Sequence, residues 1–339
     1  MGGQDCRRCS GLIVPYQFPR AAEAVASWNR ALGAAFPMCL SLWRQQTESD
    51  PNFRPEDARL LEVEGQVVGG VLTKRLRALD QDQDCEGHRY WGWIAALWVE
   101  PEHQRQGFGS QLLHWAEAYL QSAGCQRIEL GGSFQHFFPG LPVGQPDLFS
   151  FFHRHGYRIE EEPCHDLITR LESDTVVRGE DARRILANRG YRASLGIEVD
   201  GDRFLDFMGD AFPGRWRYEQ ALTLEQGGQM EEQLLLRTSM GEIVGFVHLH
   251  FPGEAVIHPS LFWATLLEEP AGGIGPLGIH PTLQRQGLGE LLVSVALGEL
   301  AQRGIRVCVV DWTNLMAFYG RWGFRPWKSY RRASKELKG

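Results

Sequence analysis

The sequence predicts an α/β (α+β) fold that is used twice, as two domains that each contain a mixed sheet flanked by helices. The hexapeptide Gln104–Gly109 (QRQGFG) returns 180 positions later as Gln284–Gly289 (QRQGLG), each time after a proline turn. Each copy stands between an apolar run and a run of helix formers. A chain of 339 residues is also long enough for two domains of ordinary size.

The repeat is wider than the hexapeptide, since each copy reads as strand, turn, glycine loop, helix, glycine stop and second strand. The apolar runs have the character of strands buried on both faces. Leucines and alanines recur at helical spacing after each loop, and Gly124 and Gly304 end the two helices. The predicted strands cover residues 93–99 and 127–131 in the first copy and 273–279 and 306–311 in the second, and the first helix covers 110–122.

Matching elements flank this core in both halves. Hairpins turn at Glu64-Gly65 and at Met240-Gly241, and an aromatic-rich helical segment precedes each one, at about 20–48 and 202–226. A short helix and an aromatic–glycine turn follow each second strand. The chain turns polar near Glu172–Gly179, so we place the domains at 1–174 and 175–339.

Composition excludes several classes of protein. The formal net charge is −7 and the lysines and arginines are scattered, which argues against a nucleic-acid-binding surface. No apolar run approaches the roughly 20 residues of a membrane span, and the first residues do not resemble a signal peptide. The seven cysteines indicate reduced, cytoplasmic thiols. Cys6 and Cys9 have the spacing of half a zinc site, but no second pair is obvious, so we predict no metal.

The glycine loops predict an anion site in each half. A loop that leads from a buried strand into a helix gathers backbone N–H groups around one concavity, and the helix dipole adds positive potential. Glycines let an anion approach the backbone, and Arg105 and Arg285 can add charge. Such a site fits a phosphate or pyrophosphate, although a tightly packed helix start would have the same sequence. Neither loop has the pattern of a nucleotide P-loop or a Rossmann fingerprint.

On these residues the chain resembles the GNAT N-acetyltransferase superfamily, in its tandem two-domain bacterial type. The resemblance rests on Gln104-x-x-Gly107-x-Gly109, on its second copy, and on an element order that is similar in both halves. It implies two GNAT-like domains with splayed sheets, acetyl-CoA as co-substrate, and a backbone N–H near Leu277 or Gly278 that polarises the thioester carbonyl. The cofactor-binding residues that it implies are Leu277, Gly278, Ile279, Gln284, Arg285, Gln286, Gly287, Leu288, Gly289 and Asn314, with Leu97, Val99, Gln104, Arg105, Gln106, Gly107, Phe108 and Gly109 in the first half.

The resemblance also implies a general acid. In the family a tyrosine after the fifth strand protonates the departing thiolate, and Tyr319 in "FYGRWGF" matches it. Phe152 stands at that position in "FFHRHGY" and cannot donate a proton. We therefore predict that the C-terminal domain is catalytic and that the N-terminal domain lacks the acid. The N-terminal copy then holds CoA idly, holds nothing, or mainly shapes the substrate site.

The general base is less evident, because neither predicted fourth strand contains a carboxylate. Asp311, at the end of the fifth strand, either faces the acceptor as the base or caps the short helix, with Thr313 and Asn314 as rival caps. Of the two, we favour the cap. His248 and His250 share one face of a strand, where a solvated or site-lining pair fits better than a metal pair, and His280 reads as a turn residue.

The predicted function is transfer of an acetyl group from acetyl-CoA to a primary amine of a small molecule, within a ternary complex. Phe212, Trp216 and Tyr218 are candidates for the acceptor wall, and Asp210 or Glu219 for holding the ammonium. The layout resembles glucosamine-type acetyltransferases and mycothiol synthases, so we favour an amino sugar. The alternatives are a non-catalytic acyl-CoA-binding regulator and a protein lysine or N-terminal acetyltransferase. We expect a cytoplasmic monomer or homodimer.

Overall fold

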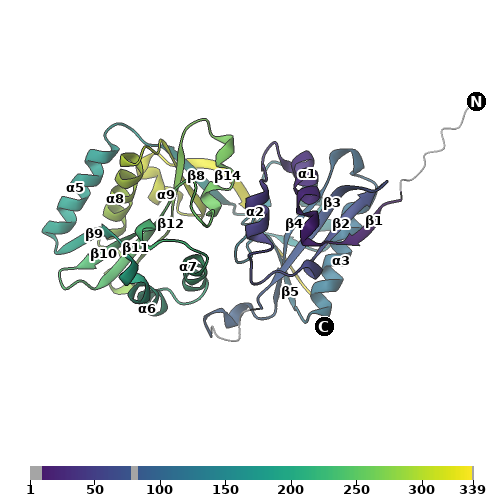
Figure 1. The fold of residues 1–339 in the computed structure, drawn as a ribbon, viewed down its shortest axis with the longest axis horizontal. Coiled ribbons are helices and arrows are strands. Elements are labelled where there is room, and N and C mark those ends of the chain that lie inside the picture. Colours follow the sequence, from purple (N-terminus) through teal and green to yellow (C-terminus); the bar gives the residue numbers. More distant parts are fainter. Residues whose placement is uncertain (1–9, 78–82, 338–339) are drawn as a thin grey trace, which may run out of the picture. The chain divides into compact units, whose positions relative to one another are not determined.

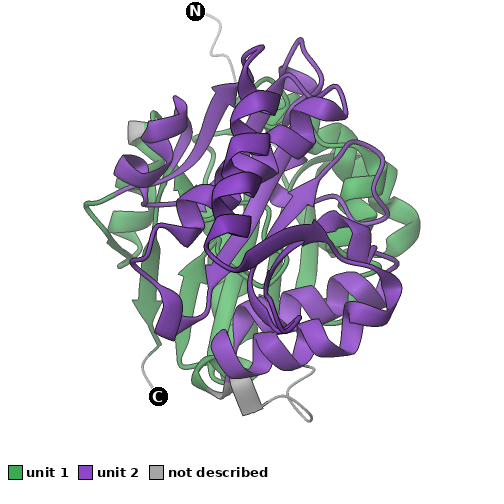
Figure 2. Cartoon of the chain, turned by 90° about the vertical axis from the view of Figure 1, so that its left-hand side faces the viewer, with its two compact units in different colours: residues 1–81, 87–162, 330–339 green, residues 82–86, 163–329 purple. Residues whose placement is uncertain are grey.

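The structure, a computed structural model, describes residues 10–77 and 83–337 of the chain. These residues form two compact units (Figures 1 and 2). Residues 10–77, 87–162 and 330–337 belong to unit 1, and residues 83–86 and 163–329 belong to unit 2. Cys6 and Cys9, the predicted half of a zinc site, lie outside the described residues.

Unit 1 has a seven-stranded sheet in the order β1-β2-β3-β4-β5-β15-β7. Only the central pair, β4 and β5, is parallel among the pairings that the structure describes. The elements of this unit are β1 (Leu12–Pro15), α1 (Ala21–Leu32), α2 (Leu40–Gln46), β2 (Ala58–Val63), β3 (Gln66–Arg75), β4 (Trp91–Val99), α3 (Phe108–Ser122), β5 (Arg127–Leu130), β6 (Leu141–Pro142), α4 (Pro146–Arg154), β7 (Arg158–Ile159) and β15 (Ala333–Glu336).

Helices cover both faces of that sheet. Side chains along a strand point to the two faces in turn, and here both sets are apolar and need to be covered. Val99 joins the leucines of α3 in the aliphatic core on one face. Trp98 instead packs with Trp28 of α1 and Trp43 of α2 on the other face. The aromatic-rich segment before the first hairpin therefore forms an aromatic layer over the sheet.

Unit 2 repeats the plan with strands in the order β9-β10-β11-β12-β13-β8-β14. Its parallel pair is β12 and β13. The elements are β8 (Cys164–Arg170), α5 (Thr175–Asn188), β9 (Tyr191–Leu195), α6 (Gly201–Ala211), α7 (Arg215–Glu225), β10 (Gln233–Thr238), β11 (Ile243–His250), β12 (Ala271–Ile279), α8 (Leu288–Gln302), β13 (Val307–Thr313), α9 (Met316–Tyr319) and β14 (Arg325–Arg331). The predicted strands, hairpins and helices are confirmed within a few residues.

Packing explains the two layers of unit 2. The helices α5 and α8 lie together on one face, where the backbones of Gly179 and Gly298 approach so closely that a Cβ on Gly179 would meet the Gly298 Cα at 3.0 Å. On the other face Phe204 and Phe207 of α6 pack edge-on against Phe246 of β11. Aliphatic residues form the first layer and aromatic residues the second, as in unit 1.

The two repeats exchange their last strands. β8, which follows the first repeat in sequence, lies beside β13 in unit 2, with Leu167 opposite Val310. β15, the last strand of the second repeat, lies beside β5 in unit 1, with Ser334 opposite Glu129. Each sheet is therefore completed by a strand from the other repeat. The predicted domain boundary between residues 174 and 175 stays a prediction about where one repeat ends and the next begins. The helix α5 begins at Thr175, inside the polar segment.

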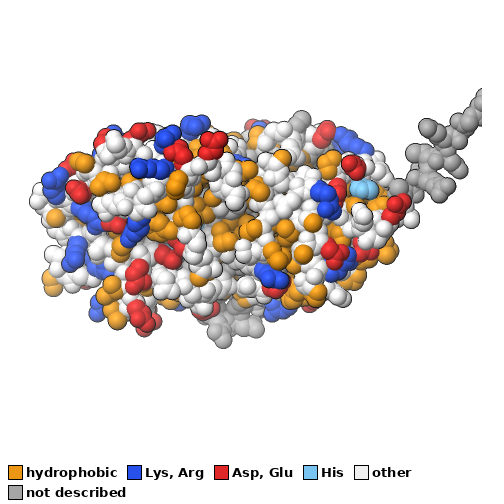
Figure 3. Space-filling view, turned by 45° about the horizontal axis from the view of Figure 1, so that its top comes forward, with side chains coloured by type: hydrophobic (Ala, Val, Ile, Leu, Met, Phe, Trp, Pro, Cys, Tyr) orange, Lys and Arg blue, Asp and Glu red, His pale blue; other side chains and the backbone are white. Residues whose placement is uncertain are grey.

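On the face shown in Figure 3, acidic and basic side chains are interspersed with apolar ones. Among the described residues, no helix combines the length and the apolar character that crossing a membrane requires. The described cysteines, namely Cys39, Cys85, Cys125, Cys164 and Cys308, are free thiols.

Candidate active site

The two glycine loops adopt the same backbone conformation. Arg105 and Arg285 have φ values of 61° and 59°, and Gly107 and Gly287 have φ values of 88° and 76°. Gln104 donates its side-chain amide to the carbonyl of Val99 at 2.9 Å, and Gln284 donates in the same way to Ile279 at 3.1 Å. The repeated glutamine thus ties the loop to the end of the preceding strand.

Each loop leaves its amides open. Within the described residues no hydrogen bond engages the backbone N–H groups of Arg285, Gln286 and Gly287, and the same holds for residues 105–107. The first N–H groups of α8 add to this set, because they have no partner within the helix. A cluster of free N–H groups at a helix start suits a phosphate or pyrophosphate. The donor set therefore fits the predicted coenzyme.

One difference separates the two loops. Arg105 forms an exposed ion pair with Asp147 of α4. Arg285 has no ion-pair partner among the residues that the structure describes. The positive charge at the edge of the loop is therefore available in unit 2 and already engaged in unit 1.

The central parallel strands part beyond their first residues. β12 pairs with β13 only from Ala271 to Gly273, and β4 pairs with β5 only from Trp91 to Ile94. A bulge opposite β11 accompanies the parting, since Gly275 and Pro276 both face His248. The predicted splay is thus present in both units.

Strand alternation decides which amides face the opening. His280 donates its N–H to Val244 on β11 at 2.9 Å. Successive amides of a strand point to opposite edges, so Gly278 also faces β11, whereas Leu277 and Ile279 face the opening. Of the two amides named from the sequence for the oxyanion, Leu277 therefore has the suitable direction. Gly278 serves packing, because a Cβ there would lie 2.5 Å from the ring of Phe212.

Asp311 lies at the place where the strands part. It belongs to β13, and Leu315, not Asp311, occupies the cap position of α9. The Leu315 N–H is taken by the Thr313 hydroxyl at 3.1 Å. The favoured interpretation of Asp311 as a helix cap is therefore wrong, because β13 continues past it. Its carboxylate lies 3.7 Å from Nδ1 of His258, and burial raises its pKa to about 6.

Tyr319 is the second titratable group at this opening. Its side chain is buried, and burial together with the nearby Asp311 carboxylate raises its pKa. The phenol therefore stays protonated at neutral pH, as a general acid must. Phe318, its neighbour, packs 3.9 Å from the Cβ position of Gly289, so the short helix α9 lies against the glycine loop.

Charged and aromatic groups surround the carboxylate of Asp311. Arg215 of α7 stacks over the ring of Trp312 at 4.5 Å and donates to Glu219 at 2.8 Å. Trp312 has a φ of 40°, and its N–H donates to Asp166 on the exchanged strand β8 at 3.1 Å. The strand from the first repeat thus holds the backbone beside Asp311.

Other predicted residues have different places. Phe212 packs against Phe207 and Phe246 in the aromatic core, and the exposed Asp210 lies 3.2 Å from His280. His280 is confirmed as a turn residue, because its Nδ1 accepts the Thr282 N–H. Asn314 is exposed beyond the end of β13, and Trp216 is 38% exposed.

The histidine pair on β11 is buried, not solvated. His248 and His250 are 3% and 1% exposed. His250 Nε2 lies 2.6 Å from the Gly275 carbonyl, which fixes its tautomer, and its ring stacks on His258. Among the described residues no group of three or more histidine, cysteine, aspartate or glutamate side chains is arranged to hold a metal. The pair therefore lines the site at Asp311.

Unit 1 has no counterpart of these groups. In the repeat, Gly131 occupies the position of Asp311. Phe152 occupies the position of Tyr319, because its neighbour Phe151 packs on Gly109 in the same way as Phe318 packs on Gly289. Lys74, opposite Trp93, takes the place of His250, opposite Gly273. Lys74 is buried in an ion pair of 2.6 Å with Asp50. Unit 1 therefore has a glycine and a phenylalanine where unit 2 has Asp311 and Tyr319, and an ion-paired lysine where unit 2 has His250.

His258 is the site residue that sequence reasoning missed. A signal existed, because His258-Pro259-Ser260 repeats the chemistry of His280-Pro281-Thr282. In both, the histidine Nδ1 accepts the N–H of the third residue. The segment is fixed by Gly273, where a Cβ would overlap the Ser260 hydroxyl.

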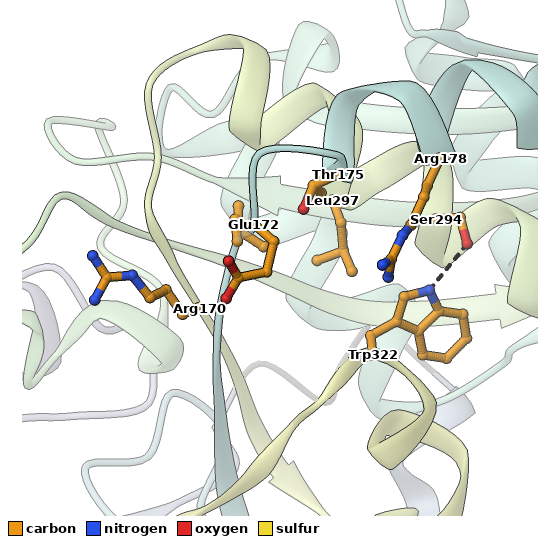
Figure 4. Close-up of a pocket in the computed structure, with 8 residues that line it drawn as sticks. Arg170, Glu172, Thr175, Arg178, Ser294, Leu297 and Trp322 are labelled. Carbon is orange, nitrogen blue, oxygen red and sulfur yellow. Dashed lines mark hydrogen bonds between the residues drawn. The ribbon is translucent and has the colours of Figure 1, made fainter.

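A separate hollow of unit 2 lies beside the start of α5 (Figure 4). Trp322 borders it and donates its ring N–H to Ser294 at 3.0 Å. Its arginines are engaged, Arg170 with Glu269 and Arg178 with Asp174. None of the predicted site residues lines this hollow.

Solved structures share the two-unit fold. A GCN5-related glucosamine N-acetyltransferase region of a fungal multi-domain GH3 β-N-acetylglucosaminidase matches with a TM-score of 0.82 and 22% identity, over 96% of this chain and 38% of that one. This chain thus spans well under half of that protein. A GCN5-related N-acetyltransferase from Sphaerobacter thermophilus matches with a TM-score of 0.65 and 15% identity, over 98% and 97% of the two chains. A tandem GNAT protein from the clavulanic acid biosynthesis pathway matches with a TM-score of 0.63 and 16% identity, over 97% and 99%.

No curated protein matches the chain. The family model described as "Acetyltransferase (GNAT) family" matches residues 26–136 and again residues 202–324, which together make up more than half of the sequence. Each match contains one glycine loop and the parting strands that precede and follow it. The chain therefore belongs to the acetyltransferase (GNAT) family and carries two copies of its domain.

Proposed function

We propose that this protein is an acetyl-CoA-dependent N-acetyltransferase whose chemistry takes place in unit 2 and whose acceptor is the primary amine of a small molecule. One observation carries the proposal. A largely buried carboxylate, Asp311, and a buried phenol, Tyr319, lie close enough to interact electrostatically at the opening between β12 and β13, next to a loop of free amides. Unit 1 has the loop but a glycine and a phenylalanine in place of the two side chains.

The residues present suit the three services that amine acetylation needs. Asp311, with its pKa raised to about 6, is ionised at neutral pH and can take a proton from the ammonium of the acceptor. The Leu277 N–H faces the opening and can donate to the developing oxyanion. Tyr319 can give its proton to the departing thiolate and take back the second proton that the amine nitrogen loses as it becomes an amide. When bound, acetyl-CoA supplies the activated acyl group.

The coenzyme would be held by the loop of unit 2. Its pyrophosphate would accept from the N–H groups of residues 285–289, with Arg285 adding charge. Ile279 is the last residue of β12 and Asn314 directly follows β13, so both stand at the two strands that part, where the pantetheine arm would run. The loop of unit 1, with residues 104–109 after Leu97 and Val99, is proposed as a second coenzyme site without turnover.

An amino sugar is the acceptor class that we favour. Sugars bind to the faces of tryptophans beside carboxylates. Trp216 lies on α7 with Glu219, Trp312 follows Asp311 on β13, and Arg215 bridges Glu219 and the Trp312 ring. The structural neighbour of fungal origin is named for glucosamine N-acetylation. The cytoplasmic location and the monomeric or homodimeric state stay predictions.

The test is turnover by the purified full chain. Acetyl-CoA is mixed with a panel that contains D-glucosamine, a polyamine, an amino acid and a lysine peptide, and free CoA thiol is measured against time. We expect thiol release that depends on the acceptor, with D-glucosamine as the best substrate. Calorimetric uptake of acetyl-CoA without release by any amine would instead support the non-catalytic binding protein, and release with the peptide alone would support a protein acetyltransferase.

A further inference from the structure

His258 is placed to exchange a proton with Asp311. Its Nδ1 lies 3.7 Å from the carboxylate Oδ1 and accepts the backbone N–H of Ser260 at 3.3 Å. A histidine nitrogen that accepts a backbone N–H carries no hydrogen of its own, so in neutral His258 the proton is on Nε2. The nitrogen with the lone pair is therefore the one nearest to Asp311.

The ring of His258 is held in this orientation from two sides. It lies parallel to the ring of His250, with centroids 3.5 Å apart and planes 5° apart. His250 is itself fixed by its hydrogen bond to Gly275. Ser260, which fits only because residue 273 is glycine, fixes the other edge. Such a preorganised ring needs no rearrangement to act.

A proton on Asp311 has few other routes. The Asp311 side chain is only 14% exposed, and Glu254 and Glu232 lie beside His250 and His248, with their pKa values raised by burial. The charged or titratable groups that act on Asp311 are His250, Glu219 and Arg215, while Asp311 and Cys308 act on Tyr319. The side chain of His258 retains 19% of its accessible surface, so one edge of it meets solvent.

We propose that His258 is a proton carrier that works with Asp311 and returns the carboxylate to its ionised form in each turnover. This rests on the proposed function. The amine gives its proton to Asp311, and the Asp311 O–H bond then breaks as a new bond forms to Nδ1 of His258. The imidazolium gives up its Nε2 proton to solvent, which leaves a neutral ring whose proton is on Nδ1. Uptake of a proton from buffer at Nε2, followed by release of the Nδ1 proton to buffer, restores the starting tautomer without net change, so one proton leaves per acetyl group transferred.

The experiment compares His258→Asn with a matched control, His280→Asn. An asparagine oxygen can still accept the N–H of residue 260 or 282, so both variants keep the local turn. His280 has the same cap chemistry but faces Asp210, not Asp311. The measurements are turnover of acetyl-CoA with D-glucosamine from pH 5 to 9, the Kd for acetyl-CoA, and turnover as imidazole buffer is added at constant ionic strength.

We expect His258→Asn to lower kcat on the order of tenfold to a hundredfold with an unchanged Kd for acetyl-CoA. Added imidazole should restore most of the lost kcat in a saturating way, because a small base can replace the missing carrier, whereas a structural defect would not respond. His280→Asn should turn over as the wild type does, without a response to imidazole. Wild-type kcat in His258→Asn, or a loss that imidazole does not repair, would overturn the inference. An inactive wild-type protein would overturn the proposed function instead.

Discussion

Replacing Asp311 with asparagine should make the protein more stable and less active at the same time. The carboxylate belongs to a side chain that is only 14% exposed, and burial raises its pKa from 3.8 to about 6. A carboxyl group with a raised pKa binds more protons in the folded than in the unfolded state. The free energy of unfolding of the wild type therefore falls as the pH rises from about 4 to about 6, while the amide variant has no such loss.

The size of the effect follows from the pKa difference. About two pKa units at about 1.36 kcal/mol each correspond to ~3 kcal/mol. For a unit of 150–250 residues, each kcal/mol shifts Tm by about 2–4 °C. The Tm of Asp311→Asn relative to wild type should thus rise by about 6–12 °C between pH 4 and pH 8. At pH 8 the kcat of Asp311→Asn should lie about 10²–10⁴-fold below that of the wild type.

The assay is a set of thermal melts of both proteins at pH 4, 6 and 8, with turnover measured on the same samples. Asp206→Asn, on the exposed face of α6, controls for loss of one negative charge. If the Tm difference between variant and wild type is the same at pH 4 and pH 8, the claim that the ionised Asp311 carboxylate destabilises the fold is refuted. An unchanged kcat at pH 8 would remove Asp311 from the chemistry even if the melts agree.

Three further predictions test other parts of the molecule. Tyr319→Phe should lower kcat at least tenfold with the same Kd for acetyl-CoA, and Phe152→Tyr should change neither, as steady-state kinetics and calorimetry will show. Gly287→Val should abolish coenzyme binding by unit 2, because a branched residue does not tolerate a φ of 76°. The number of acetyl-CoA molecules bound per chain in calorimetry should therefore fall by one. An unchanged number would rule out this loop as a coenzyme site. Lys74→Met should destabilise unit 1 by about 3–5 kcal/mol in denaturant titrations, and adding Asp50→Leu should recover most of that loss; additive losses would contradict the buried ion pair.

The loops and the repeated order of elements could be predicted because their signals are local. Each signal lies within a few residues and occurs in both copies: a proline turn, a glutamine that binds the end of the preceding strand, and a glycine that must adopt a positive φ. Hairpin turns at Glu64-Gly65 and Met240-Gly241 are equally local. Tyr319 was assigned because "FYGRWGF" matches the tyrosine motif of the family, and Phe152 in the matching motif indicated which copy lacks the acid.

The strand exchange could not be predicted, because a short strand pairs equally well with either of two similar sheets. Nothing in the apolar pattern of 164–170 or 333–336 distinguishes its own sheet from the other one. Asp311 was assigned to a cap because its sequence neighbours are good caps and the bulge that extends β13 depends on Asp166 of the exchanged strand. His258 lies in an irregular segment whose position over Gly273 depends on tertiary packing.

The exchanged strands also set the order in which the chain can complete its folding during synthesis. Arg127 of unit 1 bonds Glu336, 209 positions later, so β5 keeps an unpaired edge until residues 333–336 have left the ribosome. Unit 2 has no such delay, because β8 is made before the sheet that receives it. Because each sheet contains a strand from the other repeat, neither half of the gene can be deleted or replaced by recombination without removing a strand from the sheet that the other half encodes.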